Sequence, residues 1–221
     1  MTEKSKTLDA LPSVIPVFPL PGVILLPGAS LPLNIFEPRY LKMVRDAATG
    51  HNLIGMLQPR EKEGHGKAPP LFSIGGVGSI SEFHETEDGC IVIRLKGLSR
   101  FRVDEELSVT TPYRQVRADW KTFKEDPWGG NSKTRVERDT LMASLKAYLD
   151  IKGLDADFSA IAEAPDDVLV NTLSMIVPFS PAEKQALLEA SEVWDRSELL
   201  KQLLTMAASN LAANDSDSSA H

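Results

Sequence analysis

This chain has few residues that could bind a metal or a cofactor, and their spacing fits neither kind of site. Its four histidines lie too far apart for zinc-finger or zincin spacing: His51, His65, His84 and His221. The stretch 64–68 lacks the first glycine and the hydroxyl residue of a phosphate-binding loop. The stretch 76–79 lacks the third glycine of a dinucleotide fingerprint. We therefore predict no metal, no cofactor and no nucleotide.

Nucleophilic catalysis has equally little support. No G-x-S-x-G motif is present, and the single cysteine, Cys90, precedes an alternating strand pattern, where a lone cysteine is usually a small apolar side chain. Folding could still bring His84 and Cys90 together with carboxylates, or a serine together with a lysine. We nevertheless expect a protein that is not an enzyme, so its chemistry should be that of binding.

The sequence Phe36-Glu37-Pro38-Arg39-Tyr40 is the best local candidate for binding a peptide. It stands where a strand pattern changes to a helical one, and Phe36, Arg39 and Tyr40 offer two aromatic faces and a planar guanidinium to an extended chain. A structural alternative accounts for these residues at least as well. Glu37 and Arg39 would then form an ion pair that locks the corner, with Phe36 and Tyr40 in the core.

A second aromatic group lies near the middle of the chain, at Trp120, Phe123 and Trp128. It leads into the segment KEDPWGGNSK at 124–133, which contains Trp128 and whose proline and glycines predict a connection between two parts of the chain. Large aromatic side chains beside such a connection often mark a binding interface. The alternative is that they seal the two parts together.

These candidates must be positioned by a β-rich half. Its opening is dense in prolines, which fix φ and lack an N–H, so we expect short or edge strands at 14–18, 23–26 and 31–36. Pro38 begins a helix that ends at Gly50. Alternation and turn residues predict further strands at 53–57, 72–84, 91–96, 101–103 and 113–120, with a turn at 97–99. The glycines at 75, 76 and 78 predict a bend where another backbone comes close.

Helical periodicity takes over in the second half. It predicts helices at 136–149 and 166–177, a third beginning with the capping box of Ser180 and Glu183, and a last one from about Asp195. The expected divisions are a flexible lead (1–12), a β-rich unit (13–123), a linker (124–133), a helical bundle (134–208) and a disordered tail (209–221).

Charge and composition narrow the partners. The chain of 221 residues carries 24 Lys and Arg against 31 Asp and Glu, a net charge of −7. A nucleic-acid-binding surface needs an excess of cations, so none is expected. The start of the chain has no apolar signal-peptide stretch, and no apolar run approaches the roughly 18 residues of a membrane span. We expect a cytoplasmic protein that binds neither nucleic acid nor membrane.

Three segments resemble one known family in sequence and order. IPVFPLPGVILLPGASLPLNIFEPRYLKMVRDA (15–47), DGCIVIRLKGLSRFRV (88–103) and SPAEKQALLEASEVWDRSELLKQLL (180–204) are similar to the amino-terminal substrate-recognition domain of Lon proteases, in a stand-alone bacterial form without ATPase and protease modules. The resemblance implies an α+β fold: a small, bent, PUA-like β-barrel with one inserted helix, followed by an α-helical bundle.

The resemblance also implies a function. We expect a non-catalytic module that captures exposed or unfolded polypeptide segments in a shallow apolar groove between barrel and bundle. Its affinity would come from apolar burial and from a client strand added to one of the short, proline-limited strand edges. Two alternatives stay open. One is an adaptor for a single folded partner, such as a protease or a chaperone, and the other is an RNA-binding or small-ligand-binding PUA-like protein. The sequence sets no oligomeric state.

Overall fold

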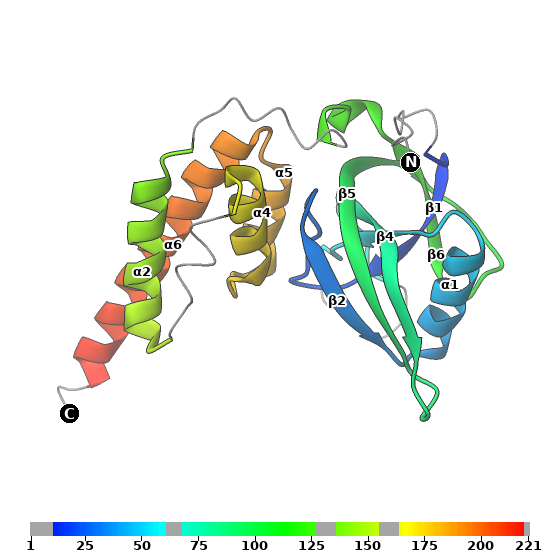
Figure 1. Ribbon diagram of the computed structural model, residues 1–221, viewed down its shortest axis with the longest axis horizontal. Coiled ribbons are helices and arrows are strands. Elements are labelled where there is room, and N and C mark those ends of the chain that lie inside the picture. The colour runs from blue at the N-terminus through cyan, green and yellow to red at the C-terminus, as the bar shows by residue number, and fades with distance from the viewer. Residues whose placement is uncertain (1–10, 61–67, 127–135, 155–163, 219–221) are drawn as a thin grey trace.

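The computed structural model describes residues 11–60, 68–126, 136–154 and 164–218, which form a β-rich half beside a helical half (Figure 1). The β-rich half contains β1 (Val14–Pro19), β2 (Ser30–Ile35), α1 (Pro38–Thr49), β3 (Leu53–Leu57), β4 (Ile74–Glu85), β5 (Ile91–Glu106), β6 (Arg114–Asp119) and the short 3-10 helix η2 (Lys121–Phe123). The helical half contains α2 (Arg138–Lys152), α4 (Asp166–Ile176), α5 (Pro181–Glu189) and α6 (Val193–Ser218). This order confirms the predicted α+β class.

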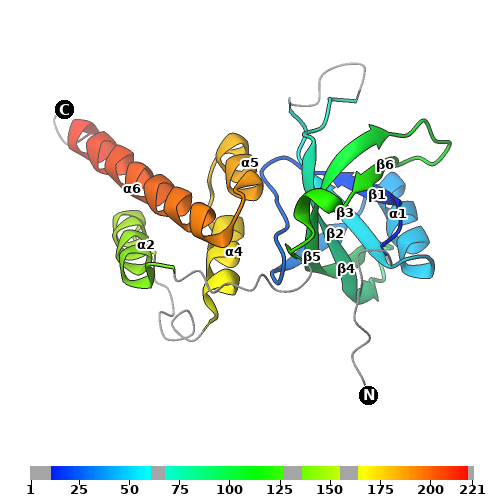
Figure 2. The ribbon, with the colours of Figure 1, turned by 90° about the horizontal axis from the view of Figure 1, so that it is seen from above.

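The β-rich half is a bent sheet that closes on itself. Its strand order is β2-β5-β4-β3-β1-β6, and a further pairing joins β5 to β6. β5 can do this because its first part (91–96) lies between β2 and β4, whereas its last part (102–106) pairs with β6. Within the described residues, β3, β4, β5, β6 and β1 therefore form a ring, and β2 lies outside it on β5. Helix α1 lies on the side of the ring away from the bundle (Figure 2).

Residues 23–26, predicted as a strand, instead form an irregular segment that crosses the sheet. Its side chains at Leu25 and Leu26 are fully buried. The segment lies so close to the sheet that a Cβ at Gly76 would meet the Leu25 carbonyl oxygen at 1.7 Å, and one at Gly97 would meet the Leu26 carbonyl oxygen at 2.0 Å. The close approach predicted at the β4 glycines is thus present, and this segment fills it.

The predicted turn at 97–99 is wrong for the same reason. β5 continues through these residues as one strand of 16 residues. Gly97 donates its N–H to the Ala29 carbonyl oxygen at 2.8 Å and accepts from the Gly28 N–H at 3.0 Å. Gly97 is therefore a point of close backbone approach and not a turn residue.

In the helical half, α5 begins where its capping residues predict. At the start of α5, Ser180 donates its N–H to Glu183 Oε2 at 2.7 Å, and Glu183 donates its N–H to Ser180 Oγ at 3.3 Å, which completes the predicted capping box. Helix α6 differs, because it continues to Ser218 through the stretch predicted as a disordered tail from 209. The alanines at 207, 208, 212 and 213 favour this continuation. Most of the predicted lead and linker lies outside the described residues.

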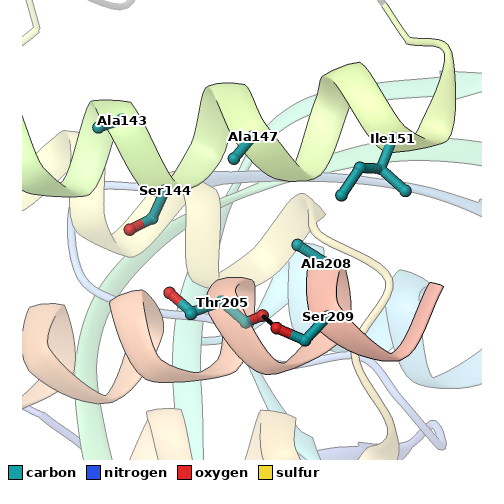
Figure 3. Close-up of a pocket in the computed structure, with 7 residues that line it drawn as sticks. All are labelled: Ala143, Ser144, Ala147, Ile151, Thr205, Ala208 and Ser209. Atoms are coloured by element: carbon teal, nitrogen blue, oxygen red, sulfur yellow. Dashed lines mark hydrogen bonds between the residues drawn. The ribbon is translucent and has the colours of Figure 1, made fainter. Parts of the chain in front are cut away.

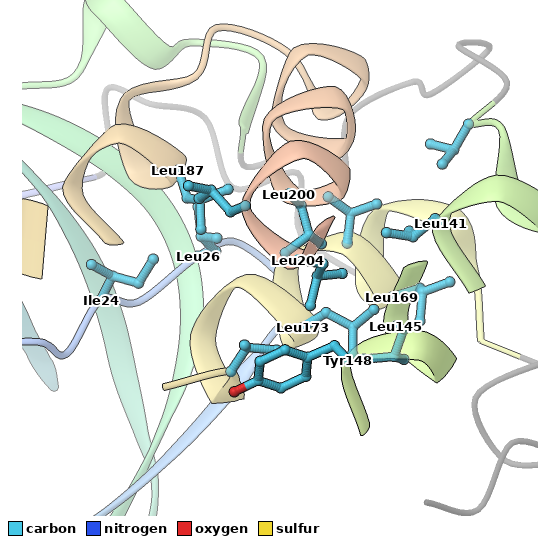
Figure 4. Packing of buried hydrophobic residues seen from close by; sticks show 14 of the residues in the cluster. Ile24, Leu26, Leu141, Leu145, Tyr148, Leu169, Leu173, Leu187, Leu200 and Leu204 are labelled. Atoms are coloured by element: carbon cyan, nitrogen blue, oxygen red, sulfur yellow. The ribbon is translucent and has the colours of Figure 1, made fainter. Parts of the chain in front are cut away.

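The largest apolar cluster joins the two halves. Ile24 and Leu26 from the crossing segment pack with side chains from all four helices, among them Leu187, Leu200 and Leu204 (Figure 4). Each of these five side chains is at most 2% exposed. Separating the halves would return this surface to water, so they are held together by burial as well as by the chain.

Candidate functional site

The corner at 36–40 divides into an exposed part and a buried part. Phe36 follows β2 and is 67% exposed. Tyr40 is 5% exposed and packs on Phe18 with ring centroids 4.2 Å apart. Arg39 lies over the Tyr40 ring at 4.6 Å and donates to Glu37 Oε2 at 2.9 Å. The ion pair of the structural alternative is therefore present, while Phe36 alone offers its ring to solvent.

The second aromatic group is buried where the structure describes it. Trp120 is 8% exposed and donates its indole N–H to the Pro12 carbonyl oxygen at 3.1 Å. Phe123 is 9% exposed and lies under the Arg100 guanidinium at 4.2 Å. Trp128 lies outside the described residues. Trp120 thus belongs to the core of the β-rich half, whereas Phe123 lies at the junction through Arg100; neither ring is open to a peptide, and neither lies at the Phe36 corner.

Arg100 is the centre of the junction between the halves, and sequence reasoning missed it. Its guanidinium makes a two-pronged ion pair with Asp126, with Nε to Oδ2 at 2.8 Å and Nη2 to Oδ1 at 3.0 Å. It also donates to carbonyl oxygens just after the end of α5 or in its last turn, those of Leu188, Ala190 and Ser191. A cation is favourable there because carbonyl groups at a helix C-terminus are unpaired and partly negative. Arg100 thus fixes the barrel to α5.

Buried polar side chains complete this junction. Gln58, which is fully buried, accepts from the Gly22 N–H at 2.7 Å and donates to Gln185 Oε1 at 3.1 Å. Asn171 of α4 donates to the Pro27 carbonyl oxygen at 2.9 Å and accepts from Arg196 at 2.9 Å. A groove between barrel and bundle was expected to capture clients. These contacts occupy the part of the junction around Gln58 and Asn171, so a client would need a surface elsewhere on the molecule.

Exposed apolar side chains gather at the end of the ribbon formed by β2, β5 and β4. Phe36, Val92 and Phe83 are 67%, 42% and 45% exposed, and we call them the ribbon-end patch. Val92 stands between Asn34 and His84 in the sheet register, and Phe36 is two residues beyond Asn34. The alternation of a strand places Phe36 and Val92 on one face and Phe83 on the other. The hairpin of β4 and β5 projects beyond the rest of the barrel at the bottom of Figure 1.

A hollow of about 170 Å³, lined mostly by apolar atoms, lies beside the end of α1 and includes Asp46 and Tyr113 in its lining. Tyr113 donates its hydroxyl to Asp46 Oδ2 at 2.8 Å, and Lys42 donates to both carboxylate oxygens of Asp46. The hydrogen bond from Lys42, followed by that from Tyr113, lowers the pKa of Asp46. Burial, followed by the hydrogen bond to Asp46, raises the pKa of Tyr113 to about 12. Both groups are thus held in one protonation state near neutral pH and tie α1 to the start of β6.

A larger hollow of about 480 Å³ lies between α2 and α6 (Figure 3). None of its lining residues is titratable: Ala143, Ser144, Ala147, Ile151, Thr205, Ala208 and Ser209. Such a lining supports apolar contact and no acid–base chemistry. In the part of the chain that the structure describes, no three histidine, cysteine, aspartate or glutamate side chains are grouped to hold a metal. The same part contains no helix long and apolar enough to cross a membrane.

Comparison with protein families gives one match over most of the chain. The model of the ATP-dependent protease La (LON) substrate-binding domain matches residues 14–206. The Lon protease of Parabacteroides distasonis is 29% identical over 213 residues, which cover 89% of this chain and 24% of that protein. The Lon protease of Escherichia coli is 27% identical over 196 residues, which cover 86% and 24%. The chain thus spans about a quarter of the length of these relatives.

Solved structures share the fold. A Lon N-terminal domain protein from Xanthomonas campestris superposes with a TM-score of 0.60 at 23% identity, over 85% of this chain and 96% of that one. The N-terminal domain of the Mycobacterium avium complex Lon protease superposes with a TM-score of 0.57 at 15% identity, over 87% and 98%. The likeness extends over both halves.

Proposed function

The chain belongs to the family of Lon substrate-binding domains, and on this premise we propose that it binds exposed, unfolded segments of other proteins without acting on them chemically. The observation that carries the proposal is the ribbon-end patch, in which Phe36, directly after β2, is 67% exposed. An unfolded segment exposes the apolar side chains and unpaired backbone that such a surface accepts, whereas a folded protein buries both.

The size of the patch supports weak and general binding. Complete burial of one large apolar side chain is worth about 1.5–3 kcal/mol. Phe36 and Val92 share one face of the ribbon and are 67% and 42% exposed, so a client on that face gains only a few kcal/mol from burying them. The loss of freedom on association costs about 4 kcal/mol or more, so the patch alone supports only weak binding. Affinity of this order suits a module that samples many clients.

The titratable groups support a role without catalysis. The hydrogen bond from Lys42, followed by that from Tyr113, lowers the pKa of Asp46, and burial, followed by Asp46, raises the pKa of Tyr113, so neither group changes protonation state near neutral pH. Burial, followed by the neighbouring Asp88 carboxylate, raises the pKa of the Cys90 thiol, which disfavours the thiolate that a nucleophile requires. A single free cysteine also suits the reducing cytoplasm, which we propose as the place of action.

The test is fluorescence anisotropy of labelled α-lactalbumin, titrated with this protein in two forms: reduced and carboxymethylated, hence permanently unfolded, and native. We expect saturable binding to the unfolded form alone. The variant Phe36→Ala should weaken binding roughly threefold to tenfold, the equivalent of losing most of one side-chain contact. Met206→Ala is the matched control, because Met206 is 60% exposed on α6, away from the patch.

Equal binding of both forms, or of neither, would overturn the proposal. If neither binds, capture of one stoichiometric folded partner from an extract would favour the adaptor alternative. A labelled RNA in the same assay gives the third outcome. Binding that weakens steeply with added salt would favour nucleic acid, against the net charge of −7.

A further inference from the structure

Strand β2 has hydrogen-bonding capacity that the described structure leaves unused. Among the described residues, β2 pairs only with β5, along one edge and over its full length from Ser30 to Ile35. The backbone groups of alternate residues in an antiparallel strand point to opposite edges. Ala29 faces β5, because its carbonyl oxygen accepts from the Gly97 N–H at 2.8 Å. Residues 31, 33 and 35 therefore also face β5, and residues 30, 32 and 34 face away.

The proline in β2 agrees with this assignment. Pro32 has no N–H, so it fits the strand where its nitrogen faces away from β5. The outer edge then carries the N–H groups of Ser30 and Asn34 and the carbonyl groups of all three residues. Ser30, Pro32 and Asn34 are all exposed. The missing donor at Pro32 also limits pairing of this edge with another copy of itself.

Apolar side chains border the edge on its inner side. Leu31 and Leu33 are half-buried and pack on the apolar cluster of the barrel, as does Met175 of α4. The bundle itself contacts the chain just before β2, where Asn171 donates to the Pro27 carbonyl oxygen and Val168 approaches Gly28. Among the described strands, none lies beside the outer edge of β2. A strand added there would place every second side chain beside Leu31 and Leu33.

We propose, building on the proposed function, that the outer edge of β2 binds the client as an additional β-strand. Ser30 and Asn34 donate their N–H groups to client carbonyl oxygens, and the carbonyl groups at 30, 32 and 34 accept client N–H groups. Backbone pairing makes the site indifferent to most client side chains. Alternate client side chains reach Leu31 and Leu33, so the preferred segment carries apolar residues at every second position. Folded proteins pair their own strands and are excluded.

The first test is a proline substitution on the protein. Asn34→Pro deletes the outward N–H and places a ring where the client would pair, while the ladder to β5 stays intact; Asn34→Ala is its control. We expect Asn34→Pro to bind carboxymethylated α-lactalbumin at least about fivefold more weakly than Asn34→Ala, since one hydrogen bond and the steric fit are lost. Equal affinities in two folded variants, as judged by circular dichroism and thermal unfolding, would overturn strand addition.

The second test changes the ligand, so it stands even if Asn34→Pro fails to fold. The probe is a labelled ten-residue peptide in which valine alternates with serine, N-methylated either at every valine or at every serine. We expect one methylated set to lose binding and the other to retain it, because only one set of N–H groups can face β2 when the valines face Leu31 and Leu33. Equal binding by both sets would refute strand addition while binding itself remains. If the unmethylated peptide and the unfolded α-lactalbumin both fail to bind wild type, the proposed function itself fails.

Discussion

Replacing Asp126 by alanine should be among the most damaging single changes at the junction of the two halves. The carboxylate accepts three hydrogen bonds from Arg100: from Nε at 2.8 Å, from Nη2 at 3.0 Å and from the backbone N–H at 2.9 Å. The Arg100 side chain is 5% exposed and that of Asp126 is 13% exposed. Removing the carboxylate therefore leaves a buried cation without its counter-charge.

The magnitude follows from the loss of those bonds. Breaking a buried ion pair by removing one partner costs about 3–5 kcal/mol. Arg100 keeps its three carbonyl acceptors and the Phe123 ring, which places the expected cost near the lower end, at about 3 kcal/mol. The assay is urea unfolding with linear extrapolation to the free energy of unfolding in water.

Glu82→Ala is the matched control, because it removes the carboxylate of an exposed pair. Glu82 lies 2.9 Å from Arg94 Nε, and the two side chains are 65% and 43% exposed. An exposed pair contributes at most about 1 kcal/mol and weakens in salt. The role of Arg100 as a buried ion-pair partner is refuted if Asp126→Ala lowers the free energy of unfolding no more than Glu82→Ala does. It is also refuted if the effect of Asp126→Ala disappears in about 1 M salt, as the effect of an exposed ion pair does.

Three further changes test other parts of the structure. Gly76→Ala places a Cβ 1.7 Å from the Leu25 carbonyl oxygen, a clash well beyond ordinary overpacking. It should lower the free energy of unfolding, measured by thermal unfolding, by more than about 3 kcal/mol. A loss below about 1 kcal/mol would show that residues 23–26 do not pack against Gly76. Ser180→Ala removes the N-terminal cap of α5 and should lower the free energy of unfolding, measured in urea, by about 1 kcal/mol. An unchanged free energy of unfolding would mean that the capping box does not stabilise the fold. Burial lowers the pKa of Lys184 from 10.5 to about 8, so the unfolded chain binds this proton more tightly than the folded protein does. The free energy of unfolding should therefore rise between pH 8 and pH 10.5, by up to about 3 kcal/mol. Lys184→Met should remove this rise, and an unchanged pH dependence would refute it.

The sequence predicted those helix boundaries that are set by residues at the boundary itself. The capping box at Ser180 and the proline at the first position of α1 set helix starts, and both are observed. The segment 23–26 has the composition of a strand, but its position is set by Gly76 and Gly97, which lie far away in the chain. No local pattern shows which glycine a distant backbone will cover. Turn and strand predictions therefore failed at these close approaches.

The candidate site was predictable only in part, for a related reason. Arg100 precedes Phe101 in an alternating strand, a pattern that predicts an outward-facing, solvated cation. It is 4% exposed because the bundle covers the face of β5 that a lone barrel would leave in water. Phe36 was identified from the sequence, but its exposure rests on Ile35 and Tyr40 taking the core positions on either side. Strand periodicity shows which side chains share a face of β5, but it does not show that the helical half covers that face.

The open edge of β2 follows from the same prolines that made the opening of the chain recognisable. A ring of strands needs every member to pair on both sides, and Pro32 can pair on only one. The ring therefore closes through β5 and β6 and leaves β2 outside, where its outer carbonyl groups and two N–H groups have no strand beside them in the described structure. A glycine or valine at 32 would restore the third donor without disturbing the pairing to β5. If strand addition is correct, Pro32→Val should bind unfolded clients more tightly and self-associate more readily, and sedimentation velocity beside the anisotropy titration would detect both; unchanged affinity would indicate that the edge is not used.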